Sequence, residues 1–158
     1  SRRSNLVSMY SAADVEGHRG KDNHYHIIDF SRAMPPVKYE RTMPASNLFR
    51  LFRPEFVLAY SKPLCPDGFS GFITHDPMKQ KYNQDLVEAT LVLENKCKSF
   101  SRNLVWQVME AREHKKLKEY PLVEKLHREG INLRYLGLIL SHVPPDDEEK
   151  FVVTRCYL

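Results

Sequence analysis

The sequence predicts an α+β domain in which a small antiparallel sheet, an N-terminal hairpin, precedes a mostly helical array. Two patterns predict this class. Near the N-terminus, apolar and polar residues alternate around a turn rich in Gly, Asp and Asn. From about residue 80 onward, apolar residues instead recur at three- and four-residue spacing. Strands and helices that are segregated along the chain are typical of α+β domains.

The hairpin is predicted from two short segments, 12–18 and 24–30. The loop between them, residues 19–23, carries Gly20, Asp22 and Asn23, which tolerate the backbone conformations of tight turns. Alternation in the second strand places His24, His26, Ile28 and Phe30 on one face and Tyr25, Ile27 and Asp29 on the other. The Pro35-Pro36 pair is then expected to end regular structure.

The middle of the chain predicts one helix and one long loop. Ser46 is a plausible N-cap for a helix whose apolar residues include Leu48, Leu51 and Phe52. Pro54 is expected to kink or split this helix. Residues 62–78, with several prolines and glycines, predict a long loop pinned by its aromatic side chains.

Three apolar stripes predict the helical part, at residues 86–93, 100–109 and 122–127. Gly130 is expected to follow the third as the C′ residue. Asn132 is then expected to cap a helix over Leu133–Val143, with Pro144-Pro145 as its stop. Trp106 falls at helical spacing, which favours a core position over a base-stacking platform.

The composition describes an ordinary globular chain of one domain's length, 158 residues. The net charge of +4 permits contact with nucleic acid but does not argue for it. The three cysteines, Cys65, Cys97 and Cys156, are too scattered for a disulfide framework or a zinc finger, which fits a reducing, cytosolic compartment. No apolar run is long enough to span a membrane, so no membrane insertion is expected.

Both ends are expected to be truncated, so that residues 1–158 form a single domain of a larger protein. The chain starts at Ser1 without a methionine, and it stops at Leu158 inside an amphipathic segment. Other domains of the same larger chain are therefore expected partners.

Two kinds of chemistry are weighed and not favoured. His18, His24 and His26 could meet on the hairpin as metal ligands, but strand faces often pair polar groups without ligating anything. Asp29, which follows an apolar strand in Ile28-Asp29-Phe30, resembles the metal-binding aspartate of a kinase lobe, yet no glycine-rich phosphate loop or preceding strand lysine accompanies it. A phosphotransferase-like lobe with Asp29 holding metal is kept as the alternative function. Neither a metal nor a cofactor is predicted.

A basic stretch follows the second stripe. Lys115, Lys116 and Lys118 are expected at a helix end, where cations complement the helix dipole. A solvated helix end is the default interpretation, and a contact with RNA or phosphate is the functional one. Cys65 has no neighbouring base in sequence and is interpreted as an inert thiol.

Two ordered motifs resemble the clustered mitochondria (Clu) family. The first is Asp14-x-Glu16-Gly17-His18-x-Gly20-x-Asp22, followed by Tyr25, Asp29, Arg32 and Pro35-Pro36. The second is Leu126-His-Arg-Glu-Gly130-Ile-Asn132-Leu-Arg-Tyr-Leu-Gly137, and the stretch 51–57 between them is also similar. Asn23-His24 stands where the family has Gly-Arg, and residues 62–100 do not match well. The resemblance spans roughly residues 14–140 and predicts a Clu-like domain.

The resemblance implies a cytoplasmic, non-enzymatic protein linked to translation and mitochondrial organisation. Members of the family bind messenger RNAs for mitochondrial proteins, associate with ribosomes and with initiation factor three, and keep mitochondria dispersed. The expected partners are therefore messenger RNA and ribosome or initiation-factor components.

The motif residues themselves favour architecture. Gly17 and Gly20 are expected to allow close backbone approach or positive φ, Asp22 to shape the turn, and Asp29 to pair with Arg32 at the strand end. Gly130 and Asn132 close one helix and open the next. The functional alternative is a binding groove at the charged hairpin end, with His18, Asp29 and Arg32 as its candidate residues.

Overall fold

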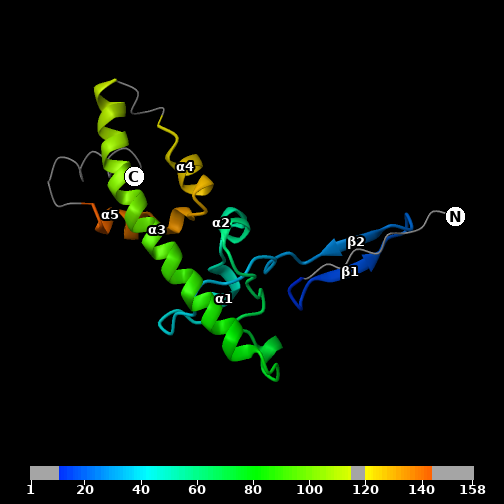
Figure 1. The fold of residues 1–158 in the computed structure, drawn as a ribbon. Helices are drawn as coiled ribbons and strands as arrows, with labels where there is room; N and C mark the ends of the chain where they lie inside the picture. The colour runs from blue at the N-terminus through cyan, green and yellow to red at the C-terminus, as the bar shows by residue number, and fades with distance from the viewer. Residues whose placement is uncertain (1–10, 115–119, 144–158) are drawn as a thin grey trace. The chain divides into compact units, whose positions relative to one another are not determined.

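The computed structural model describes residues 11–114 and 120–143. A two-stranded antiparallel hairpin precedes five α-helices within these residues, which confirms the predicted α+β class (Figure 1). The chain divides into two compact units. The first contains the chain up to Leu51 together with Leu64–Leu86, and the second contains Phe52–Pro63 together with the chain from Val87. The division falls within the long helix α3, Lys79–Glu113.

The hairpin of the first unit is shorter than predicted. Strand β1 is Glu16–Arg19 and strand β2 is Tyr25–Ile28, with His18 opposite His26. All eight strand residues are exposed. Asp29, at φ +59°, ends β2 because a left-handed backbone cannot continue a strand. The left-handed Asn23, at φ +69°, makes the turn as its residue type predicts.

The prolines after the hairpin begin a buried segment of the first unit. Pro35, Pro36 and Val37 are buried. Pro36 forms an isolated antiparallel bridge with Leu51, and Val37 N donates to Arg50 O at 2.8 Å. Because β2 has already ended at Ile28, the pair does not end the hairpin; it starts a short extended contact.

The first short helices begin differently from the prediction. Helix α1, Ser46–Phe49, has Ala45 as its N-cap in a left-handed conformation, so Ser46 is not the cap. Ser46 is buried because its Oγ instead accepts from Glu40 N at 3.1 Å. Pro54 does not kink a helix. It starts α2, Pro54–Ala59, where its missing N–H costs no hydrogen bond.

Residues 62–78 form the expected long loop, interrupted by one 3-10 turn, η1, Gly71–Ile73. This loop is pinned in part by Asn83, whose Oδ1 accepts from Phe69 N at 2.9 Å. Tyr39 packs against the Phe69 ring at a centroid distance of 6.4 Å, which supports the predicted role of the aromatic side chains.

The first two apolar stripes lie on one continuous helix, α3. In the second unit its buried residues recur at four- and seven-residue spacing, which places them on one face: Ala89, Leu93, Cys97, Leu104 and Val108. Trp106 is 68% exposed, so the predicted core position for this residue is wrong. Its place on the helix turns it away from the buried stripe.

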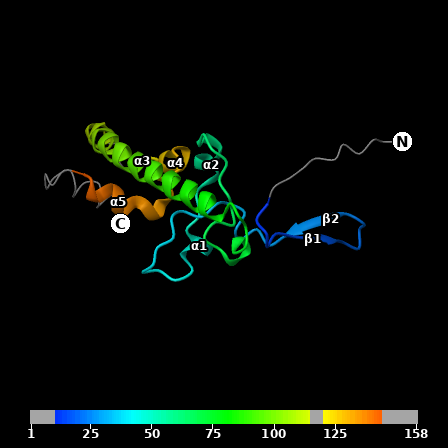
Figure 2. The same cartoon turned by 60° about the horizontal axis from the view of Figure 1, so that its bottom comes forward.

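Two short helices flank this part of α3 in the second unit. Helix α4, Leu122–Arg128, and α5, Leu136–Ser141, both lie beside α3 (Figures 1 and 2). Gly130, at φ +73°, ends α4: Gly130 N donates to His127 O and Ile131 N to Leu126 O, both at 2.9 Å. These two bonds are the Schellman pattern, and they confirm the predicted C′ glycine. Ile131 is fully buried.

The last predicted helix is shorter and is preceded by a 3-10 turn. Asn132 Oδ1 accepts from Arg134 N at 3.0 Å, so Asn132 caps the turn η3, Leu133–Tyr135, rather than an α-helix directly. Helix α5 then follows from Leu136. Ile139 and Val143 are buried. The predicted stop at Pro144-Pro145 lies outside the described residues.

Candidate functional site

Arg32 is buried, with only 3% of its side chain exposed. Its Nε donates to Asp14 Oδ2 at 2.7 Å and its Nη2 to Asp67 Oδ1 at 3.1 Å. Both oxygens of Asp67 also accept from Ala13 N at 3.1 Å. The guanidinium lies over the Phe72 ring, 5.0 Å from its centroid. Arg32 thus connects the segment before β1 to the long loop.

The charges of this Arg32 cluster stabilise one another. The hydrogen bond from Arg32 lowers the pKa of Asp14, and burial opposes it only in part. The same bond raises the pKa of Arg32. Arg32 Nη1 and Asp14 Oδ1 are buried and have no hydrogen-bond partner among the described residues. Because the guanidinium is buried between two carboxylates of the same unit, the geometry supports an architectural role.

Asp29 does not pair with Arg32, which corrects the predicted ion pair. Its Oδ1 accepts from Ser31 Oγ at 2.7 Å and from Ser31 N at 3.4 Å. The side chain is exposed and shapes its own turn. The reason lies in the chain's path: the left-handed Asp29 turns its carboxylate toward Ser31, while Arg32 is buried against the two other carboxylates.

The hairpin histidines interact with two separate carboxylates. His18 Nε2 lies 2.8 Å from Glu16 Oε2, whereas His26 Nε2 lies 3.1 Å from Asp22 Oδ1. His24 also lies near Asp22, and the hydrogen bond with His26 lowers the pKa of Asp22. Within the described residues, no three His, Cys, Asp or Glu side chains are placed to share a metal ion.

The two motif glycines of the hairpin differ in what they require. A Cβ at Gly20 would lie 2.5 Å from Asp22 Oδ1 and 2.7 Å from His26 Nε2. These contacts are the ends of two exposed side chains, so the predicted close backbone approach or positive φ is not what Gly20 shows. A Cβ at Gly17 would meet nothing within 4 Å, so no close approach explains that residue.

The structure does not describe the predicted basic patch. Lys115, Lys116 and Lys118 lie outside the described residues, and the described part of α3 ends at Glu113. Burial raises the pKa of Cys97 to about 11 and also raises the pKa of Cys65. Both thiols therefore stay protonated at neutral pH, which disfavours a nucleophilic role.

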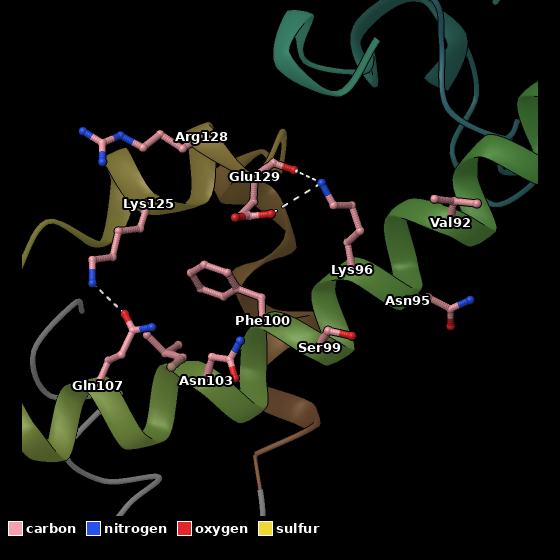
Figure 3. Close-up of a pocket in the computed structure, with 11 residues that line it drawn as sticks. Val92, Asn95, Lys96, Ser99, Phe100, Asn103, Gln107, Lys125, Arg128 and Glu129 are labelled. Carbon is pink, nitrogen blue, oxygen red and sulfur yellow. Dashed lines mark hydrogen bonds and ion pairs between the residues drawn. The ribbon is translucent and has the colours of Figure 1, made fainter. Parts of the chain in front are cut away.

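Sequence reasoning missed a groove between α3 and α4 in the second unit. It has a volume of about 680 Å³ and mixes amide, aromatic and charged side chains (Figure 3). Figure 3 shows the Phe100 ring projecting from α3 into the space beside α4. Asn103 and Gln107 line the same face of α3, and Lys125 and Arg128 line it from α4. The missed signal was the polar face of α3 on which Asn103 and Gln107 recur at four-residue spacing.

The cations of this groove are held at its edges. Lys96 Nζ donates to Glu129 O at 2.9 Å and lies 3.5 Å from Glu129 Oε2 (Figure 3). Lys125 Nζ donates to Gln107 Oε1 at 2.6 Å. Arg128 Nη2 donates to Glu124 Oε1 at 2.5 Å, with 75% of the arginine side chain exposed. Glu129 is the single carboxylate lining the groove, so its described lining is cationic.

A second cavity continues the groove toward the C-terminal end of α3. Its volume is about 440 Å³, and it shares Gln107 and Lys125 with the first. Tyr120 Oη donates to Gln107 Oε1 at 2.7 Å, and the Lys125 ammonium lies 4.5 Å from the Tyr120 ring centroid. Burial raises the pKa of Tyr120 to about 12, so the phenol stays a donor.

Comparison with known families gives two matches, one toward each end of the chain. The family model for Clustered mitochondria matches residues 1–39, which contain the first motif. The resemblance predicted from that motif is thereby confirmed. The family model for Translation initiation factor eIF3 subunit 135 matches residues 119–155, which contain the second motif, Leu126–Gly137. The two matches thus link the chain's end regions to one family named for clustered mitochondria and one named for translation initiation.

Neither family model covers half of the chain. The two matches therefore describe what the chain's end regions are similar to. No curated protein and no solved structure matches the chain. No helix in the described ranges has the length and apolar character needed to cross a membrane.

Proposed function

We propose that the chain is a non-enzymatic binding module of a Clu-like cytoplasmic protein that links messenger RNA to translation and affects mitochondrial distribution. The observation that carries this proposal is the pair of family matches, Clustered mitochondria at residues 1–39 and Translation initiation factor eIF3 subunit 135 at residues 119–155. Messenger RNA and ribosome or initiation-factor components are the proposed partners.

The charge distribution supports RNA as one of these partners. The chain carries a net charge of +4, and the stretch Lys115, Lys116 and Lys118 lies between α3 and α4, the two helices that form the cationic groove. Basic residues supply most of the affinity of non-specific RNA binding by neutralising phosphates. His18 and Asp29 are exposed on the hairpin and remain candidates for a protein contact, while Arg32 is proposed to position the hairpin.

The test measures RNA binding by the triple variant Lys115→Glu/Lys116→Glu/Lys118→Glu. We expect single-stranded RNA to bind the unmodified chain in a salt-dependent manner. In the variant, the slope of log affinity against log salt should fall by about 0.7 for each phosphate that the lysines no longer neutralise. The measurement is a titration of labelled RNA at several salt concentrations.

The matched control changes the net charge by the same amount at other positions. It replaces the exposed residues Lys21, Lys98 and Arg102 with Glu. This control should keep more affinity than the test variant. Equal loss in both variants would mean that only net charge matters. Unchanged binding by the test variant would remove the lysine patch from the proposal. If the unmodified chain binds no RNA, the RNA part of the proposed function is wrong.

A further inference from the structure

We propose that the groove between α3 and α4 binds single-stranded RNA, with a base against Phe100 and backbone phosphates at the Lys96 and Arg128 edges. The inference rests on the proposed function in taking RNA as the ligand. It names a site, however, that does not include the basic patch at residues 115–118.

Aromatic side chains on α3 offer two surfaces for base stacking. The Phe100 ring lines the groove, and Trp106 is 68% exposed six residues further along the helix, or about 9 Å along its axis. An exposed tryptophan carries a large apolar surface that the described residues leave uncovered. Bases stack on such rings with little regard to sequence, because every base has a flat face.

Two amides that line the groove offer hydrogen bonds to base edges. Gln107 Oε1 accepts from both Lys125 Nζ and Tyr120 Oη. Because a lysine can only donate, this arrangement fixes the amide orientation and leaves the NH₂ group of Gln107 as a donor. Asn103 lines the groove one helical turn away, with a further donor and acceptor. Unpaired bases are read through such contacts.

The cations are placed so that a phosphate can replace their present partners. Arg128 pairs with Glu124 on an exposed helix surface, and such a pair contributes a few tenths of a kcal/mol. A guanidinium binds a phosphate in bidentate fashion. At the opposite edge, Lys96 donates to Glu129 O and lies 3.5 Å from Glu129 Oε2, an exposed pair of the same weak kind.

The groove is long enough for several nucleotides. Its two cavities extend along α3 from Val92 to His114, about 33 Å at the helical rise. An acidic peptide is the competing occupant. It would use the cations but would need neither the exposed rings nor the amides, so the rings and amides favour RNA.

The test measures binding of a single-stranded RNA of on the order of ten nucleotides, a length within known single-strand site sizes. Phe100→Leu keeps an apolar side chain but removes the ring. It should weaken binding about 5- to 150-fold, the range for loss of one base stack. Asn103→Ala should also weaken binding. Because Asn103 is exposed, this second variant tests the groove even if Phe100→Leu fails to fold. Thermal melting checks the fold of both.

The charge contribution is tested by Lys96→Gln/Arg128→Gln, with Lys98→Gln/Arg102→Gln as the matched control on exposed residues of α3. The test pair should reduce the slope of log affinity against log salt by about 1.4, at 0.7 for each phosphate, and the control pair should leave it unchanged. Trp106 is the chain's single tryptophan, so quenching of its fluorescence by RNA reports binding to α3.

The outcomes separate the two proposals. RNA binding that is unaffected by all groove variants would overturn this inference and leave the proposed function standing. No RNA binding by the unmodified chain would overturn this inference and the RNA part of the proposed function. If polyglutamate binds as tightly as RNA and Phe100→Leu changes neither, the groove is an acidic-peptide site and the inference is wrong.

Discussion

Arg32 pairs one buried guanidinium with two carboxylates of the first unit. The residue looked like part of a binding edge in the sequence, where Asp29 was its nearest acidic neighbour. Its actual partners, Asp14 and Asp67, are 18 and 35 residues away along the chain. Local spacing could not identify these partners, because they depend on how the long loop folds back.

Removing this guanidinium is expected to be costly. Arg32→Met should destabilise the fold by about 3–5 kcal/mol, because Asp14 and Asp67 would lose their compensating charge while remaining partly buried. Urea unfolding at neutral pH measures the change. Arg41→Met, at an exposed position, is the control and should stay within about 0.5 kcal/mol. A similar small change in both variants would show that the cluster contributes little.

The same cluster predicts an acid-sensitive component of stability. Arg32 lowers the pKa of folded Asp14, so this carboxylate contributes stability above its unfolded pKa of about 3.9. That contribution is lost as the pH falls through the lower folded pKa. Asp14→Asn should therefore be less stable than the unmodified chain at pH 7, and the difference should narrow below about pH 4. Urea midpoints across pH 2–7 measure it, and a constant difference would contradict the assignment.

Among the elements, the ends of helices follow from residue type more closely than the starts. Gly130 was predicted as a C′ residue because glycine adopts positive φ without strain, and it does so. Ser46 was a reasonable cap by residue type, yet Ala45 takes that place, because the Ser46 hydroxyl is used by Glu40 N. That competing contact is tertiary and leaves no local pattern.

Gly130 is also expected to be the least replaceable glycine among the described residues. Its φ of +73° strains any other L-residue, and a Cβ would lie 2.6 Å from Phe56 N. Gly130→Ala should therefore cost more than the 1–2 kcal/mol typical of the left-handed conformation alone, or about 2–4 kcal/mol with the backbone clash. Thermal or urea unfolding measures the loss.

Gly137 provides the matched control within α5. A Cβ there would meet nothing within 4 Å. Gly137→Ala should leave stability unchanged or increase it by about 0.5–1 kcal/mol, because alanine is the better helix former. If the two substitutions had equal effects, the close approach between Gly130 and Phe56 would not be a determinant of stability.

At the scale of the whole molecule, the sequence predicted the order of hairpin, loop and helices because each has a local signature. It did not predict that the first two apolar stripes form one helix. Most residues between 93 and 100 are polar, but none is a proline or glycine, so the interruption of the apolar pattern does not break the helix. It also missed the α3–α4 groove. Amphipathic spacing identifies the buried face of a helix. It does not show where a second helix lies beside the polar face, and that placement creates the groove.

The single domain predicted for residues 1–158 leads to a test of cooperativity between the two compact units. Helix α3 runs without interruption through the division at Leu86 and Val87, and helix formation is cooperative along the chain. Destabilising the first unit by Arg32→Met should therefore accelerate amide hydrogen exchange in α4, which belongs to the second unit. Gly130→Ala should conversely accelerate exchange around Arg32. Faster exchange confined to the substituted unit in both variants would show two independently stable units, and the single-domain prediction would be wrong.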